Sequence, residues 1–140
     1  MLQFEITEGT LMRDPDRALQ VIAQLRERGV EFSLDDYGTG YSSLAQLRLL
    51  PVRELKIDKS FVTRMTARSQ DASIVRSTIE LAHSLDLRVV AEGVESAEDL
   101  RALYLYQCDA VQGFHLSNPV PADELDRWLA DAAIAVKSYS

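Results

Sequence analysis

The sequence predicts an α/β fold in which about five parallel strands alternate with helices. Two observations support this prediction. Short extended segments alternate along the chain with longer segments whose apolar residues recur at helical spacing. Turn and capping residues separate the segments, and strands joined through helices pair in parallel. A doubly wound sheet and part of an eight-stranded β/α barrel both fit, although five units fall short of a closed barrel.

The five predicted strands are short runs with apolar residues. They cover residues 2–7, 31–35, 54–58, 87–91 and 110–112. Asp14 can cap the first helix, which begins at Pro15 and stops at Gly29. A serine at 42 or 43 can cap a short second helix that runs to Leu50.

The second half of the chain contains three further predicted helices. One covers residues 72–85 and carries an apolar face. Ser96 can cap the next, with Glu98 and Asp99 in its first turn, where the helix dipole favours acids. Pro121 opens the last helix. We expect a frayed tail at 137–140.

Bulk composition limits the possible functions. The chain has 140 residues, enough for one domain with a modest core, and its net charge of -7 disfavours a general nucleic-acid-binding surface. Cys108 is the only cysteine, so no internal disulfide can form. No apolar run approaches the roughly 20 residues of a membrane span, and the N-terminus does not resemble a signal peptide. We expect a cytoplasmic location, or the cytoplasmic side of a membrane-anchored parent.

Two adjacent carboxylates, Asp35 and Asp36, end the second predicted strand. Neighbouring acids repel each other and are costly to desolvate, so they seldom stand at a strand end for stability alone. A divalent cation removes that cost because its charge keeps both carboxylates ionised. The pair therefore suggests a metal site at the mouth of a sheet.

The other predicted strands also end in polar residues that suit chemistry. These are Glu5, Thr7, Glu8, Lys56, Asp58, Glu92, Glu95 and Gln112. Sites in parallel α/β folds form at the carboxyl ends of strands, so we expect the carboxylates of Glu5, Asp35, Asp36 and Glu92 to converge. These four carboxylates exceed the need of one Mg²⁺, which favours two ions with Asp35 as the candidate bridge. Lys56 could steady a phosphate oxygen or the attacking hydroxide.

Each of these residues also has a structural interpretation. A lone glutamate such as Glu5 is more often solvated or a helix cap, and Lys56 alone would usually be a surface lysine or an ion-pair partner. Glu95 could cap the helix that follows it. Gly38-Thr39-Gly40 alone is weak evidence for a phosphate loop, since the lysine-containing nucleotide loop is absent. One polar group at each successive strand end favours the functional interpretation.

Five segments, in order along the chain, resemble the EAL family of cyclic-di-GMP phosphodiesterases. They are Phe4-Glu5-Ile6-Thr7-Glu8, Asp35 to Leu44, Leu50-Pro51-Val52 with Leu55-Lys56-Ile57-Asp58, Val89 to Glu95, and Gln112-Gly113-Phe114 with Pro119-Val120-Pro121. The resemblance implies that residues 1–136 are the C-terminal part of an EAL-type (β/α)8 barrel, about three-fifths of a full domain.

The resemblance also implies an activity and roles for residues. The activity is hydrolysis of the bacterial second messenger cyclic di-GMP to linear pGpG with two Mg²⁺ or Mn²⁺ ions. The implied metal ligands are Glu5, Asp35, Asp36 and Glu92, and the implied catalytic residues are Lys56 and Glu92. Glu95 and Gln112 correspond to groups that face the substrate or support the ligands. Glu8 and Thr39 correspond to residues that stabilise the loop 37–43, which the family links to dimerisation.

The sequence also departs from the family pattern. No Glu-Ala-Leu occurs in it, and the family's metal-binding asparagine and substrate-holding arginine, which lie upstream of the matched segments, have no counterpart. The chain also starts almost directly in a predicted strand. We therefore expect a truncated domain that is weakly active or inactive alone.

Two interpretations stay open. The chain is the C-terminal part of an active phosphodiesterase, or it is a non-catalytic signalling module that binds cyclic di-GMP or a protein. We expect a homodimer, sensor or cyclase domains in a parent protein, no DNA binding and no membrane contact from this segment. An unrelated doubly wound phosphohydrolase is disfavoured, because it would need a nucleophilic aspartate near the first strand, where Glu5 stands.

Overall fold

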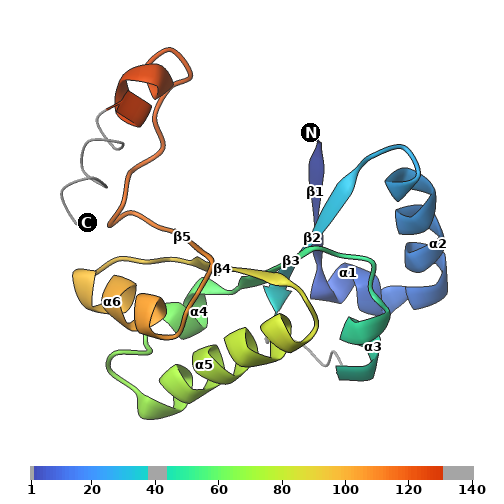
Figure 1. Ribbon diagram of the computed structural model, residues 1–140, viewed down its shortest axis with the longest axis horizontal. Helices are drawn as coiled ribbons and strands as arrows, with labels where there is room; N and C mark the ends of the chain where they lie inside the picture. Colours follow the sequence, from blue (N-terminus) through green and yellow to red (C-terminus); the bar gives the residue numbers. More distant parts are fainter. Residues whose placement is uncertain (1, 38–43, 131–140) are drawn as a thin grey trace.

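The computed structural model describes residues 2–37 and 44–130, and within them five strands form one parallel sheet (Figure 1). The strands are β1 (Gln3–Thr7), β2 (Glu31–Tyr37), β3 (Glu54–Ile57), β4 (Arg88–Glu92) and β5 (Ala110–Gln112). They lie in the sheet in chain order, β1-β2-β3-β4-β5. A doubly wound sheet reverses its strand order at a switch point, whereas a barrel adds each strand beside the last. The predicted α/β fold is confirmed, and the strand order is that of a barrel segment.

Helices connect the strands. They are α1 (Glu8–Arg13), α2 (Pro15–Arg26), α3 (Leu44–Leu49), α4 (Lys59–Val62), α5 (Ser69–Ser84) and α6 (Ala97–Leu105). Two predicted caps are confirmed. Asp14 Oδ1 accepts a hydrogen bond from the Arg17 backbone N at 3.2 Å, and Ser96 Oγ accepts one from the Asp99 backbone N at 3.0 Å. The predicted cap at 42 or 43 lies outside the described residues.

The structure corrects several predicted boundaries. Two short helices, α1 and α4, were not expected, since four to six residues are too few to show a helical period. The second strand runs to Tyr37 rather than to residue 35, and α5 begins at Ser69 rather than at residue 72. Residues 125–130 are helical, later than the predicted start at Pro121. The predicted frayed tail at 137–140 lies outside the described residues.

One face of the sheet is apolar and forms the core. Phe32, Leu34, Leu55, Ile57, Val89 and Ala91 alternate along the strands and are buried. They belong to one hydrophobic cluster with helix residues that include Leu11, Ile22, Ile79 and Leu103. The helices therefore cover this face of the sheet, as they cover the outside of a β/α barrel.

The opposite face of the sheet is polar over most of its area. The parallel register pairs Gln3 with Glu31, Glu5 with Ser33, and Thr7 with Asp35. It continues on the same face through Glu54 and Lys56, then Arg88, Val90 and Glu92, and finally Ala110 and Gln112. We call the end of this face at the carboxyl termini of the strands the upper edge, and the other end the lower edge.

The segment after β5 leads away from α4, α5 and α6 to the helical turn at 125–130, at the upper left of Figure 1. Several apolar side chains in this segment are exposed, among them Phe114, Leu125 and Leu129. No helix among the described residues is long and apolar enough to cross a membrane.

Candidate active site

Lys56 lies at the centre of the polar groups on the upper edge. Its Nζ is 2.7 Å from Glu5 Oε1 and 2.5 Å from Glu92 Oε1. The Lys56 side chain is 9% exposed, whereas those of Glu5 and Glu92 are 56% and 23% exposed. The three residues come from β1, β3 and β4, so one ammonium group bridges strands that are not all neighbours.

The surroundings of Lys56 determine its charge. Burial by itself would lower the pKa of the ammonium group, but hydrogen bonds to Glu5 and Glu92 and the nearby charge of Asp35 raise that pKa above its usual value. Lys56 is therefore a cation at neutral pH. It can donate hydrogen bonds to an anion, and it is not suited to accept a proton.

Asp35 and Asp36 lie on β2 where its pairing with β3 becomes irregular. The register shifts between Leu34 and Tyr37, and Asp36 has a φ of 57°. Bulges of this kind re-aim side chains and are frequent beside active sites. Asp35 Oδ1 accepts a hydrogen bond from the Asp36 backbone N at 2.9 Å. Burial and the negative charges of Asp35, Asp58 and Glu92 raise the pKa of Asp36.

Asp58 is a further acid of this cluster, and the sequence analysis gave it no role. Its carboxylate caps α4 by accepting a hydrogen bond from the Ser60 backbone N at 2.8 Å, and it also hydrogen-bonds with Asp36. Burial raises the pKa of Asp58, but these hydrogen bonds lower it to below its ordinary value. The sequence contained a signal for this cap, because Asp58 is an aspartate that directly follows a strand and stands two residues before Ser60.

Glu92, Glu95 and Gln112 line one cavity of about 230 Å³ at the ends of β4 and β5. Lys59, Gly93, Gly113 and Phe114 complete its lining. Gly113 is required there, because a Cβ atom at this position would overlap the backbone of Val94. The structure therefore brings the two predicted substrate-side residues together with Glu92.

Glu8 lies apart from this cavity, at the start of α1. Its side chain is buried, and its charge acts with burial, the larger cause, to raise the pKa of Tyr37. Tyr37 is the last described residue before the gap at 38–43. The role of Glu8 in stabilising the loop stays a prediction, and Thr39 lies outside the described residues.

The donor set at the upper edge consists of carboxylate oxygens, which suit Mg²⁺ or Mn²⁺. Within residues 2–37 and 44–130, however, no three His, Cys, Asp or Glu side chains are arranged to hold a metal ion. Glu5 and Glu92 point instead to Lys56. The residue types fit a divalent cation, and Glu5 and Glu92 would have to exchange contacts with Lys56 to bind one.

Comparison with known proteins identifies the family. The profile of the EAL domain matches residues 1–119. The chain belongs to the EAL domain family. Among curated relatives of this EAL chain, the bifunctional diguanylate cyclase/cyclic di-GMP phosphodiesterase MucR of Pseudomonas aeruginosa is 46% identical over 124 residues. The cyclic di-GMP phosphodiesterase NbdA of the same organism is 43% identical over 143 residues.

Coverage is unequal in these matches. The alignments take in 89% and 99% of the EAL chain but only 18% of MucR and 18% of NbdA. The chain thus spans less than a fifth of the length of these relatives, which are much larger proteins.

Solved EAL structures confirm the barrel-type fold. The PaMucR phosphodiesterase in complex with c-di-GMP superposes with a TM-score of 0.85 at 46% identity, over 89% of this chain and 50% of that chain. A calcium/cy-diGMP complex of Klebsiella pneumoniae BlrP1 gives 0.78 at 32% identity, over 84% of this chain and 30% of that chain. The five parallel strands of this EAL chain correspond to part of the barrel in those proteins.

Proposed function

We propose that this chain carries part of the active site of a cyclic-di-GMP phosphodiesterase, which hydrolyses one phosphodiester bond to give linear pGpG. The observation that carries the proposal is the position of Lys56 between Glu5 and Glu92, with Asp35 and Asp36 on the strand between β1 and β3. Further support comes from MucR and NbdA, which are named as enzymes of this class.

Glu5, Asp35, Asp36 and Glu92 are the proposed ligands of Mg²⁺ or Mn²⁺, with two ions in a complete domain. Carboxylates at the ends of adjacent parallel strands supply the oxygen donors that these ions prefer. The BlrP1 complex, which contains calcium together with cy-diGMP, supports a divalent cation in this family. When bound, the cations would supply positive charge that stabilises negative charge developing on the phosphate.

The residues of this chain have distinct proposed roles. Lys56 Nζ donates hydrogen bonds to a phosphate oxygen or to the attacking water and stabilises negative charge there. Glu92, within 2.5 Å of Lys56, is placed to accept a proton from that water. Glu95 and Gln112, which line the same cavity as Glu92, orient the nucleotide, and the 68% exposed Phe114 offers a ring for a base.

The 140-residue chain by itself is proposed to be weakly active or inactive. Its sequence lacks Glu-Ala-Leu, and both Glu5 and Glu92 are held by Lys56. Incubation with cyclic di-GMP and Mn²⁺, followed by separation of products, tests this directly. Formation of pGpG at a rate typical of enzymes, about 1 s⁻¹ or more, would contradict the proposal of an inactive fragment.

A non-catalytic module is the second candidate function. The pairing of Glu5 and Glu92 with Lys56 favours it, because the protein's own ammonium group occupies both carboxylates and offsets half of their charge. Such a module would bind cyclic di-GMP or a protein without turnover. Any pGpG production that disappears in an Asp35→Asn variant would exclude this second candidate.

We also propose that the chain associates. Phe4 is 46% exposed on β1, an edge strand within the described sheet, and Leu2, just before this strand, is 57% exposed. Exposed apolar edge strands favour pairing with another chain. A homodimer is the proposed state, and the multidomain relatives support sensor or cyclase domains in a parent protein. Light scattering after size exclusion would give the mass, and a monomer at micromolar concentration would contradict the dimer.

A further inference from the structure

A second cavity lies at the lower edge of the sheet, away from Lys56. Its volume is about 660 Å³, within the range of small-molecule sites. Gln3, Glu31, Glu54 and Arg88, which line it, lie at the beginnings of β1 to β4. The cavity is therefore distinct from the candidate active site at the upper edge.

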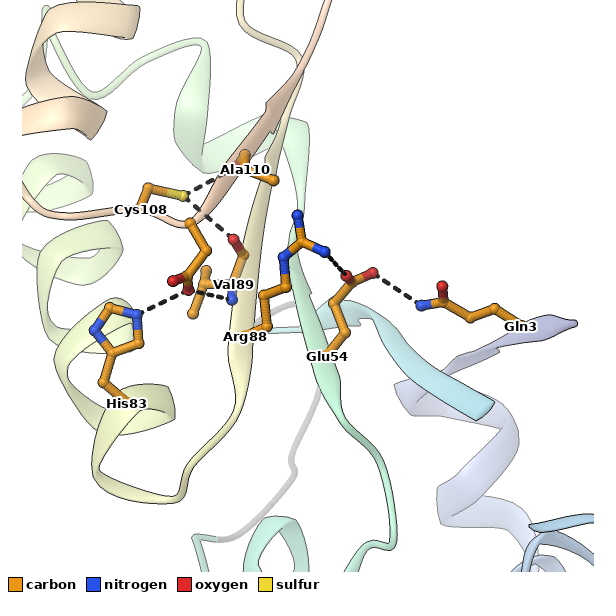
Figure 2. Close-up of polar contacts among 8 residues, drawn as sticks. Gln3, Glu54, His83, Arg88, Val89, Cys108 and Ala110 are labelled. Carbon is orange, nitrogen blue, oxygen red and sulfur yellow. Dashed lines mark hydrogen bonds and ion pairs between the residues drawn. The ribbon is translucent and has the colours of Figure 1, made fainter. Parts of the chain in front are cut away.

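Four arginines converge on this lower cavity. They are Arg26, Arg48, Arg53 and Arg88. Arg53 pairs with Glu31 at 3.3 Å and Arg88 pairs with Glu54 at 3.8 Å, and both arginine side chains are well exposed. Figure 2 shows Glu54 between Arg88 and Gln3, whose amide donates to Glu54 at 3.0 Å. Arg53 and Arg88 therefore already form ion pairs with residues of neighbouring strands.

Arg26 and Arg48 differ from that pair. Their guanidinium groups make no ion pair or hydrogen bond with any other residue of the described ranges. Each stands in the last turn of its helix, α2 or α3, where a cation complements the helix dipole. That preference explains each arginine separately. It does not explain why both line one cavity that already contains Arg53 and Arg88.

The floor of the lower cavity is apolar. Leu47, Leu50, Val52 and Leu87 line it, and each is at least nine-tenths buried. Arginine forks recognise phosphate oxygens through paired, charge-assisted hydrogen bonds. The four arginines exceed the three acids of the lining, Glu31, Glu54 and Asp86, by one positive charge, which favours an anion. A ligand with an anionic head and an apolar body therefore suits this cavity.

We propose that the lower cavity is a second ligand site, which binds a small phosphorylated molecule with an apolar or aromatic portion. Arg26 and Arg48 hold the phosphate, and the leucine-rich floor contacts the apolar portion. Such a ligand would reach the protein at the edge of the sheet opposite to the catalytic groups. The proposal does not depend on phosphodiesterase activity.

The test is an NMR titration of the metal-free 140-residue chain with phenyl phosphate, inorganic phosphate and phenol as separate probes. Phenyl phosphate should shift the amide signals of Leu47 and Leu87 saturably and bind more tightly than either other probe. Shifts confined to Glu92 and Gln112, no saturation, or equally tight binding of phenol would overturn the proposal.

Matched variants separate a built site from general charge. Arg26→Ala with Arg48→Ala should weaken phenyl phosphate at least about tenfold, through loss of two charge-assisted contacts. Arg13→Ala with Arg101→Ala removes the same charge from exposed positions outside this cavity and should leave affinity within about twofold. Equal weakening by both pairs would refute the site. If the alanine pair at Arg26 and Arg48 unfolds the chain, the variant Arg26→Lys with Arg48→Lys replaces it in the test. This lysine variant keeps both positive charges but loses the guanidinium forks, so it should also bind phenyl phosphate more weakly. Unchanged affinity of the lysine variant for phenyl phosphate would refute the site.

Discussion

Lys56 Nζ and Glu92 Oε1 are 2.5 Å apart although the two residues are not paired in the register of the sheet. The register sets Lys56 opposite Val90, so the lysine side chain extends toward the upper edge to contact Glu92, two residues beyond Val90 on β4. The ammonium group therefore lies where the carboxyl ends of β1, β3 and β4 meet. This contact is the centre of the proposed active site, and it gives the first prediction.

Lys56→Met should remove the ammonium group while keeping a side chain of similar length. In an active EAL domain that contains this segment, we expect the rate of cyclic-di-GMP hydrolysis to fall by about 10²–10³, the usual loss for one donor to a developing charge. Circular dichroism should show an unchanged fold. A fall of less than about threefold in a folded variant would show that Lys56 is a structural ion-pair partner.

Asp109 connects the beginning of β5 to the rest of the sheet. Its Oδ2 accepts a hydrogen bond from the Val89 backbone N at 2.8 Å. The same oxygen lies 2.9 Å from His83 Nε2. Figure 2 shows His83 and Val89 on either side of these contacts. Asp109→Asn weakens both, so chemical denaturation should give a free energy of unfolding about 1–2 kcal/mol lower at pH 7. An unchanged free energy of unfolding would mean that these contacts make no net contribution to stability.

The same aspartate predicts a pH dependence. Burial raises the pKa of Asp109, but the hydrogen bonds with His83 and Val89 lower it to below the ordinary value. A lowered pKa in the folded state contributes stability above the unfolded pKa of about 3.9, and this contribution is lost as the pH falls through the folded pKa. The stability difference between wild type and Asp109→Asn should therefore shrink between pH 5 and pH 3. A difference that grows on acidification would contradict this assignment.

Two glycines provide a matched pair of substitutions. At Gly113 an added Cβ would overlap the backbone of Val94, whereas at Gly9 in α1 it would meet nothing within 4 Å. Gly113→Ala should destabilise by about 1–3 kcal/mol through overpacking and should distort the cavity beside Gln112. Gly9→Ala should stabilise by about 0.5–1 kcal/mol, because alanine favours the helix. Thermal unfolding of both variants checks the two signs.

Ser33 is fully buried on the polar face, and its Oγ has no hydrogen-bond partner among the described residues. A buried hydroxyl without a partner carries its full desolvation cost. Ser33→Ala should therefore raise the free energy of unfolding by about 1 kcal/mol. If denaturant titration shows a loss of similar size instead, an ordered water or another partner satisfies Ser33.

Much of the fold followed from local signals in the sequence. The caps at Asp14 and Ser96 and the alternation of strands with helices were sufficient to predict the main elements. The short helix α1 was missed because it begins directly after β1, where Thr7 changes from strand residue to N-cap. The extension of β2 to Tyr37 was missed because it requires the bulge and the positive φ of Asp36, which depend on pairing with β3.

The candidate site was predicted in composition but not in its contacts. Acids at successive strand ends indicated that Glu5, Asp35 and Glu92 would gather at one edge. The sequence did not reveal that Lys56 would hold two of the proposed ligands, since this depends on the relative stagger of three strands. Asp58 was noted at a strand end but given no specific role, because its contact with Asp36 depends on where β3 ends and α4 begins.

The most direct test places this segment in a related enzyme. Residues 1–119 should replace the matched part of the MucR EAL domain, which is 46% identical, and the hybrid should be assayed with cyclic di-GMP and Mn²⁺. We predict that the hybrid forms pGpG and that adding Asp35→Asn abolishes this activity. A folded hybrid that binds cyclic di-GMP but forms no pGpG would contradict the proposed phosphodiesterase site and favour the non-catalytic module.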